Sequence, residues 1–342
     1  MNRRRFLIGG GAWAAGRASA QQPGPVLDKG FARVEKIAEG VYATVADASK
    51  GLQALSNGGL VVGSKGVLIV EAHLHPDAAA LEVEAARAVS KAPIRGAVNT
   101  HYHFDHTFGN VYYAGQKIPI LGHERVTPMM RENYAALKGV DKAPLLAPYA
   151  DRVAQAADSA EKQRAQGDFG AMQLVYGSID AATLSYPTES VGAAGRKIDL
   201  GGLTALLEYH PGHSPTDLIV RVPERDIVFT GDLLFNRSYP VAFDANMTDW
   251  RKVLDRFAAY GKKTRFVPGH GAACGLEGVE GEMAVMDDLR AHAEKMMKAG
   301  APPEEASRRY QIPERFKEFG MFSWGFTVGP AILKYYRELK KG

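Results

Sequence analysis

Residues 100–106 of the chain read Thr-His-Tyr-His-Phe-Asp-His, and they contain four side chains that bind metal ions: His101, His103, Asp105 and His106. The whole chain has only 10 histidines, so this density is poorly explained by a solvated polar loop. His101 and His103 lie two residues apart, and alternate side chains of an extended segment point the same way. Asp105 continues the alternation and His106 faces elsewhere, so one short loop can offer ligands to two neighbouring ions.

Three further candidate ligands follow apolar, strand-like runs at turns marked by glycine. His213 lies in the sequence Pro-Gly-His-Ser, Asp232 in Thr-Gly-Asp, and His270 in Pro-Gly-His-Gly. Ligands held at the ends of strands stand on rigid supports, as a preorganised metal site requires. The sequence therefore predicts that these three residues join the histidine-rich loop in space.

Together these segments resemble the metallo-β-lactamase superfamily, with His-x-His-x-Asp-His, then a distant His, then Gly-Asp, then Pro-Gly-His. The match extends over about residues 41–270. The resemblance implies an α/β fold, the αβ/βα four-layer sandwich, with a two-metal site at one edge of the sheets. It also implies a role for each ligand. The first metal would be held by His101, His103 and His213, the second by Asp105, His106 and His270, and Asp232 would bridge the two.

The ligand types and the resemblance together favour hydrolysis with two zinc ions. Histidine and carboxylate ligands suit zinc, although iron or manganese can use the same set. Di-iron redox relatives carry Glu at the place of His103, which favours zinc here. The best-known β-lactamases carry Cys or Ser at the place of Asp232, whereas many esterases, thioesterases and lactonases carry Asp. Two cations lower the pKa of a shared water from 15.7 to about 7, and Asp105 and Asp232 are the expected catalytic residues.

The expected substrate is a small molecule with an ester, thioester, lactone or amide bond, a β-lactam being one such amide. Two alternatives remain open. One is a mononuclear iron dioxygenase acting on a persulfide or related sulfur compound, and the other is a non-catalytic metal-binding member of the family. The sequence contains no Gly-x-Ser-x-Gly elbow and no Walker-type phosphate loop. It does not define the oligomeric state.

Composition and charge narrow the class of protein. The 342 residues are 46% hydrophobic and 23% charged, as in globular proteins and unlike disordered or collagenous chains. The formal net charge of +4 comes from four arginines among residues 1–20, which contain no acidic residue. The remaining 38 Lys and Arg residues equal the 38 Asp and Glu residues. The rest of the chain therefore lacks the basic excess that drives nucleic-acid binding.

Residues 1–20 have the three parts of an export signal. A start with three consecutive arginines precedes a short apolar stretch, and Ala-Ser-Ala precedes Gln21. Paired arginines followed by x-Phe-Leu resemble the twin-arginine signal. The apolar stretch is shorter than the ~20 residues of a membrane span. We therefore expect a periplasmic or secreted protein that keeps no stable membrane anchor after signal cleavage.

Residues 21–342 are interpreted as one metallo-β-lactamase-fold domain. Apolar runs predict strands near residues 41–46, 59–62, 67–71, 93–99, 119–121, 197–200, 203–209, 217–222, 226–230 and 265–267. Helices are expected over residues 76–90 and 248–259. The Ala-, Lys- and Glu-rich composition of residues 124–190 predicts a helical insertion or lid, with helices near 124–138 and 151–166. Residues 275–342 predict a helical C-terminal segment.

Several other residues have candidate roles. Glu71, after an apolar run, could accept a hydrogen bond from a ligand histidine. His73 and His75 also have His-x-His spacing, but their place before a helix start favours a structural role. Cys274 is the only cysteine, so it forms no intrachain disulfide, and a buried free thiol is expected. Roles outside the ligand set are also expected for other side chains, as structural residues or pocket walls: His123, His210, His292, Tyr112, Phe235 and Tyr239.

Overall fold

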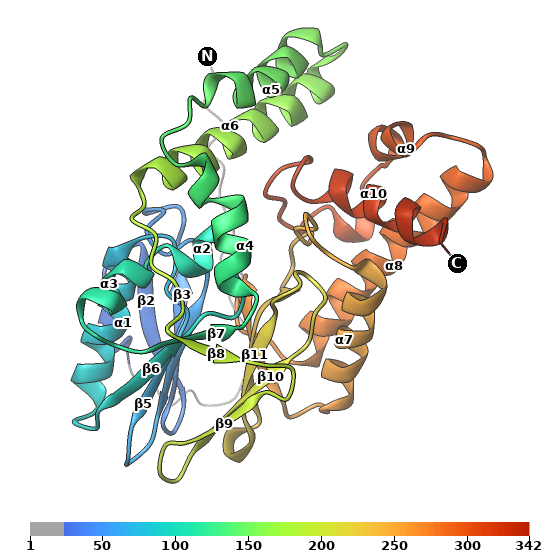
Figure 1. The fold of residues 1–342 in the computed structure, drawn as a ribbon. Coiled ribbons are helices and arrows are strands. Elements are labelled where there is room, and N and C mark those ends of the chain that lie inside the picture. Colours follow the sequence, from blue (N-terminus) through green and yellow to red (C-terminus); the bar gives the residue numbers. More distant parts are fainter. Residues whose placement is uncertain (1–23, 342) are drawn as a thin grey trace.

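The computed structural model describes residues 24–341 and contains two β-sheets packed face to face between helices (Figure 1). The segment interpreted as an export signal lies outside the described residues. The strands of the first sheet follow the order of the sequence: β1 (Leu27–Asp28), β2 (Ala32–Ala38), β3 (Val41–Ala46), β4 (Gly58–Val62), β5 (Val67–Val70), β6 (Ile94–Val98), β7 (Ile120–His123) and β8 (Glu189–Val191). Neighbours pair antiparallel from β1 to β5 and parallel from β5 to β8.

The second sheet has the order β13-β12-β11-β10-β9. Its strands are β9 (Arg196–Asp199), β10 (Thr204–Tyr209), β11 (Leu218–Val222), β12 (Ile227–Phe235) and β13 (Arg265–His270). They pair antiparallel except for β12 and β13, which are parallel. All nine residues of β12 are buried, because side chains from the first sheet cover one face and helices cover the other. The expected αβ/βα sandwich is thus confirmed.

Helices form the outer layers. The chain contains α1 (Pro76–Val89), α2 (Phe104–Thr107), α3 (Asn110–Gly115), α4 (Val126–Asn133), η1 (Ala135–Leu137), α5 (Ala143–Gln155), α6 (Ser159–Ala181), η2 (Pro223–Arg225), α7 (Met247–Ala259), α8 (Leu276–Lys298), α9 (Pro303–Arg309), η3 (Glu314–Phe316) and α10 (Val328–Leu339). Buried side chains of α1 and α3 pack against the first sheet, and those of α7, α8 and α10 form a core with the second. No helix within residues 24–341 is long and apolar enough to span a bilayer.

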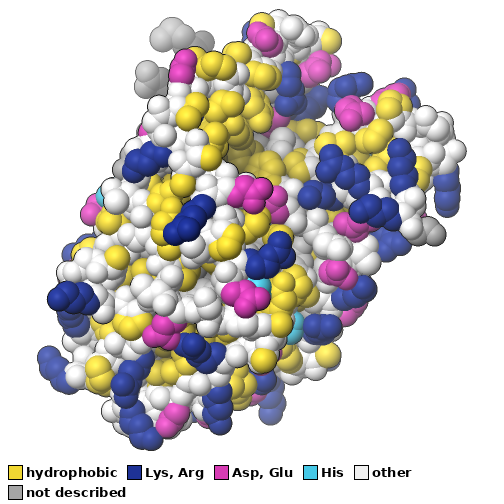
Figure 2. All heavy atoms as spheres, in the orientation of Figure 1, with side chains coloured by type: hydrophobic (Ala, Val, Ile, Leu, Met, Phe, Trp, Pro, Cys, Tyr) yellow, Lys and Arg dark blue, Asp and Glu magenta, His cyan; other side chains and the backbone are white. Residues whose placement is uncertain are grey.

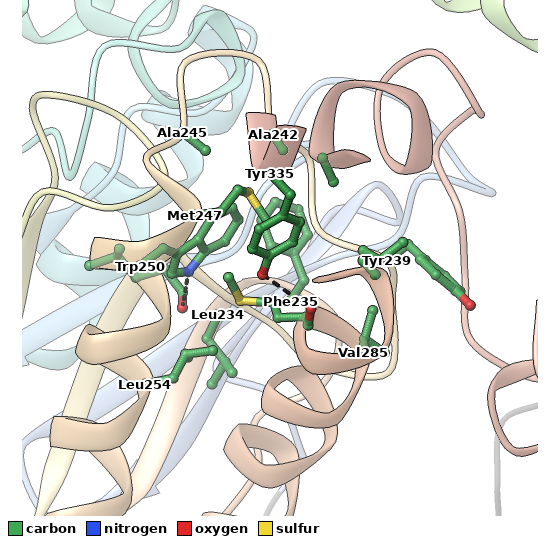
Figure 3. Close-up of a cluster of buried hydrophobic side chains, with 14 of the residues drawn as sticks. Leu234, Phe235, Tyr239, Ala242, Ala245, Met247, Trp250, Leu254, Val285 and Tyr335 are labelled. Atoms are coloured by element: carbon green, nitrogen blue, oxygen red, sulfur yellow. Dashed lines mark hydrogen bonds between the residues drawn. The ribbon is translucent and has the colours of Figure 1, made fainter. Parts of the chain in front are cut away.

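The core beneath the second sheet anchors the end of β12 (Figure 3). Trp250 on α7 and Tyr335 on α10 are almost fully buried beside Leu234 and Phe235. The Trp250 Nε1–H donates to the carbonyl of Leu233 at 3.1 Å, so this large side chain buries no unpaired donor. The strand that carries Asp232 is therefore held on a rigid base.

Strand β12 runs longer than the sequence predicted. The sequence predicted a strand that ends at residue 230 and a turn at Asp232, whereas β12 continues to Phe235. Its pairing with β13 shifts register on both sides of Gly231, whose φ of 52° is left-handed. Such an irregularity bends a strand and redirects a side chain without ending the strand, so Asp232 sits inside β12 rather than after it.

The segment between the parallel neighbours β7 and β8 contains α4, η1, α5 and α6. The sequence predicted one helix over residues 151–166, whereas α5 ends at Gln155 and α6 begins at Ser159 after its N-cap Asp158. Helix α6 then continues to Ala181, past glycines at 167, 170 and 177. Ala171, Val175 and Ile179 on α6 are buried against α4 and the histidine loop. This packing outweighs the poor helix propensity of glycine, which amounts to about 1 kcal/mol per residue.

Candidate metal centre

The seven predicted ligands come from loops and strand ends at one edge of the sandwich. The loop after β6 and helix α2 carry His101, His103, Asp105 and His106, whereas His213 lies in the loop between β10 and β11. Asp232 lies within β12, and His270 is the last residue of β13. The structure brings all seven into two groups that share Asp232, with ligand atoms in each group within 4.8 Å of one another.

The first group consists of His101, His103, His213 and Asp232, all buried. The Nδ1 atom of His103 lies 3.0 Å from Nε2 of His101 and 3.0 Å from Nε2 of His213. The Oδ2 atom of Asp232 lies 3.8 Å and 3.6 Å from the same two Nε2 atoms. Three ring nitrogens and one carboxylate oxygen thus converge on one point.

The second group consists of Asp105, His106, Asp232 and His270. The Nε2 atom of His106 lies 3.4 Å from Asp105 Oδ2 and 3.1 Å from Asp232 Oδ1. The Nε2 atom of His270 lies 3.2 Å from Asp105 Oδ2 and 3.4 Å from Asp232 Oδ2. Because the Asp232 carboxylate contributes to both groups, it stands where a bridging ligand would.

Both groups have the dimensions of a zinc site. Four ligands at about 2.0–2.1 Å from a tetrahedral zinc lie about 3.3 Å from one another, and the separations above scatter around this value. His106 Nε2 and Asp232 Oδ1 are buried and make no hydrogen bond within the described residues. Buried polar atoms are rarely left without a partner, and a cation between these two atoms would provide one.

Two glycines allow the close packing around Asp232. A Cβ on Gly269 would lie 1.9 Å from Asp232 Oδ1. A Cβ on Gly231 would lie 2.4 Å from Thr100 Oγ1, and its left-handed φ also disfavours other residues. The glycines that marked these ligands in the sequence therefore allow the close approach of β12, β13 and the histidine loop.

The electrostatics differ between the two groups. Burial lowers the pKa of His213 to about 3, so its ring is neutral and available as a ligand. Burial opposes protonation of His270 too, but the carboxylates of Asp232 and Asp105 raise its pKa to about 10. The same carboxylates raise the pKa of His106 well above its usual value against the effect of burial. An ion entering the second group would displace these protons.

Residues 53–270 match the family model described as the metallo-beta-lactamase superfamily. The chain belongs to this superfamily. An uncharacterized protein of Mycobacterium tuberculosis is 35% identical over 85 residues, which cover 22% of this chain and 38% of that protein. A second uncharacterized protein, from Mycobacterium leprae, is 33% identical over 81 residues, 22% of this chain and 37% of that protein. The chain thus matches well under half the length of these relatives.

Solved structures share the superfamily fold. The metallo-beta-lactamase from Pontibacter korlensis aligns with a TM-score of 0.52 and 17% identity, covering 74% of this chain and 98% of that one. The sec-alkylsulfatase Pisa1 from Pseudomonas sp. aligns with a TM-score of 0.57 and 14% identity, covering 89% of this chain and 50% of that one. At such low identity these likenesses show the fold alone.

Glu71 contacts a ligand, as the sequence suggested. Its Oε1 lies 3.1 Å from Nδ1 of His106, and it accepts a hydrogen bond from the Thr100 hydroxyl. Glu71 has a left-handed φ of 79°, and its carbonyl accepts from the Tyr113 hydroxyl at 2.8 Å. A carboxylate on the far side of a ligand ring fixes the orientation of that ring.

Sequence reasoning missed Asp244. Its Oδ2 lies 3.4 Å from Nε2 of His103 and accepts a hydrogen bond from the Tyr102 hydroxyl. On the neighbouring ligand, Nδ1 of His213 is 2.9 Å from the carbonyl of Val241. No motif surrounds Asp244, and its only sequence signal is a carboxylate directly after the apolar run of residues 239–243.

The remaining singled-out residues lie outside the two groups. His73 pairs with the buried Glu82 at 3.0 Å, and His75 caps α1. His123 stacks on Tyr209 with ring centroids 4.1 Å apart. The free thiol of Cys274 is buried, which raises its pKa to about 12.

Two other histidines have local partners: His210 lies 3.3 Å from Glu208, and His292 lies 2.8 Å from the carbonyl of Ala306. The prediction for Tyr112 as a pocket wall is wrong, because Tyr112 lies on α3 and packs against the first sheet.

A cavity of about 700 Å³ opens onto the metal centre. His103, Asp105, Asp232 and His270 line one end of it, together with the predicted wall residues Phe235 and Tyr239. Side chains of α4, α5 and α6, of the segment 236–244 and of residues 320–326 line most of the rest. The cavity is thus bounded by the segment between β7 and β8 on one side and by the C-terminal segment on the other.

Proposed function

We propose that this protein is an exported, binuclear metal-dependent hydrolase that cleaves an ester, thioester, lactone or amide bond of a small molecule. The observation that carries the proposal is the pair of ligand groups sharing Asp232 at the end of a cavity large enough for a substrate. Cavities of ~300–1,000 Å³ are typical of small-molecule sites.

Different side chains would bind the metal ions, orient the attacking water and form the cavity wall. His101, His103 and His213 would hold one zinc ion, and Asp105, His106 and His270 the other, with Asp232 between them. When bound, the two ions would supply a nucleophile at neutral pH and polarise the bond under attack. Asp105 lines the cavity and would orient the attacking water, and Phe235 and Tyr239 form part of the wall beside it.

Metal analysis joined to a substrate panel tests this proposal. The purified protein is expected to contain close to two zinc ions per chain and to hydrolyse at least one of nitrocefin, a thioester and a lactone. A phosphodiester and an alkyl sulfate extend the panel, the latter because a fold neighbour that covers 89% of the chain is called an alkylsulfatase. Full metal occupancy without turnover would support a non-catalytic protein instead. A single iron with oxygen consumption on a persulfide would support a dioxygenase.

The proposed location depends on residues 1–20. Fractionation of cells that express the full chain should place the protein in the periplasm or the medium, with an N-terminus near Gln21. Replacement of Arg3, Arg4 and Arg5 by Lys should retain the uncut protein in the cytoplasm. Export that persists in this variant would contradict the twin-arginine route.

A further inference from the structure

We propose that the substrate carries an extended apolar group beside its scissile bond, and that this group binds in the cavity against α6 and residues 320–326. The inference rests on the proposed hydrolase function for the reaction itself. To that function the inference adds the chemical class of the substrate and the residues that would select it.

The walls of the cavity are apolar over most of their extent. Helix α6 contributes Met172, Val175 and Ile179, and the facing segments contribute Val241, Phe243 and Phe326. Apart from the metal-centre residues, the charged side chains among the described lining are Arg237 and Asp244, both in the segment after β12. The polar groups on the helical side are Asn133 and tyrosine hydroxyls, so a substrate that is polar throughout would leave most of its hydrogen-bonding groups unpaired there, which is costly.

Aromatic side chains form the rim of the cavity. Phe243 and Phe322 are 39% and 41% exposed, unusually high for large apolar residues. Their rings lie 4.6 Å and 5.0 Å from the ring of the buried Phe326. Figure 2 shows hydrophobic side chains gathered over the α5–α6 hairpin and in the hollow beside it. Exposed apolar surface continuous with a cavity gains free energy when an apolar ligand covers it.

The apolar wall lies where it can contact the substituent next to the scissile bond. Met172 and Val175 on α6 line the same cavity as Asp105 and His270 of the metal centre. A bond held at the metal end therefore directs its attached group toward the helices. Val175 is nearly buried, so a larger side chain at this position would take up space that the substrate needs.

A series of 4-nitrophenyl esters tests the inference on the zinc-loaded enzyme. The leaving group is constant from the acetate to the octanoate, so differences report on the acyl chain. Each buried methylene should raise kcat/KM about fourfold, until the cavity is filled. A value that stays flat or falls with chain length would overturn the inference.

Two variants on α6 separate the cavity from a general effect on the fold. Val175→Phe should lower kcat/KM for the octanoate about tenfold or more and change that for the acetate less than about twofold. Gln173→Phe, at an exposed position of the same helix, should leave both values unchanged. If Val175→Phe does not fold, Val175→Ala should extend the rise in kcat/KM to longer chains. Equal losses on both esters would contradict a selective role for this wall.

Binding of 1-decanol distinguishes failure of this inference from failure of the proposed function, because this probe has no bond to cleave. Calorimetry should show that decanol binds the zinc-loaded protein and Gln173→Phe equally, and Val175→Phe at least about fivefold more weakly. Binding without hydrolysis of any ester would refute the hydrolase alone. Absence of binding would refute the apolar substrate site whatever the protein hydrolyses.

Discussion

The two nitrogens of His103 face opposite partners: Nδ1 lies 3.0 Å from Nε2 of both His101 and His213, and Nε2 lies 3.4 Å from Oδ2 of Asp244. A proton on Nε2 that points at a carboxylate leaves the Nδ1 lone pair free for a metal. Asp244 therefore sets both the tautomer and the angle of the ring. Tyr102 donates to the same carboxylate oxygen and holds it in place.

Asp244→Asn should weaken zinc binding at the first group, because an amide orients the imidazole less strongly than a carboxylate. Loss of such a partner typically costs about 10–100-fold in metal affinity. Zinc affinity measured by competition with a chelator checks this, and excess zinc should restore kcat. Asp151→Asn, at an exposed position on α5, is the control. Unchanged affinity in Asp244→Asn would show that the aspartate only lines the cavity.

Asp232 and His213 should differ in how many ions their loss removes. Asp232→Ala should release both ions, because its carboxylate belongs to both groups, whereas His213→Ala should release only one. Elemental analysis of the purified variants gives the stoichiometry, and circular dichroism shows whether they fold. Turnover should fall to background in Asp232→Ala. Two ions retained in that variant would argue against a shared ligand.

Gly269 should tolerate no side chain. The added Cβ of Gly269→Ala would lie 1.9 Å from Asp232 Oδ1, so the carboxylate must move and metal content should fall. Gly177→Ala on α6 meets no atom within 4 Å and should stabilise the helix by up to about 1 kcal/mol. Metal analysis and urea unfolding of the two variants provide the comparison. A fully loaded Gly269→Ala would mean that β13 can shift at no cost.

Asp217 should make stability depend on pH. It accepts hydrogen bonds from the backbone N–H groups of Gly212 and Ser214, but burial raises its pKa from 3.8 to about 7. The folded state therefore binds more protons than the unfolded state between these values. Its contribution to stability is complete below pH 4 and is lost as the pH rises to about 7, by up to about 1.4 kcal/mol per unit.

The effect of Asp217 is measured by urea unfolding of the wild type and Asp217→Asn between pH 4.5 and 7.5. The variant cannot ionise at this position, so the difference in unfolding free energy between the two proteins should change steadily across the window. Parallel curves would show that the hydrogen bonds to Asp217 keep it ionised throughout.

The convergence of the seven candidate ligands was predictable because each has a local signature. The histidine loop has a dense motif, and His213, Asp232 and His270 each follow a glycine that packing requires to be small. Their placement in two groups matches the sequence prediction, whereas the identity and number of the ions remain proposals. The layered fold could also be predicted from the sequence, because the buried strands are continuous apolar runs.

The residues that the sequence did not reveal depend on tertiary contacts. Asp244 reaches His103 only because residues 236–246 pass over the first group, where the N–H of Ala242 donates to the carbonyl of Phe326 at 3.2 Å. Tyr112 is close in sequence to the histidine loop, but on α3 it packs into the core between α1 and the first sheet. The full length of α6 is likewise set by packing and not by local propensity.

The parallel pairing of β7 with β8 leaves the first sheet continuous across the excursion that contains α4 to α6. None of the seven candidate ligands comes from that excursion, although it forms much of the wall against which a substrate would lie. The candidate ligands and this part of the cavity wall therefore come from different stretches of the chain. A chimera that exchanges residues 124–188 would alter this wall without replacing any candidate ligand, provided that the new segment keeps the packing of α6 against Tyr102 and Phe108.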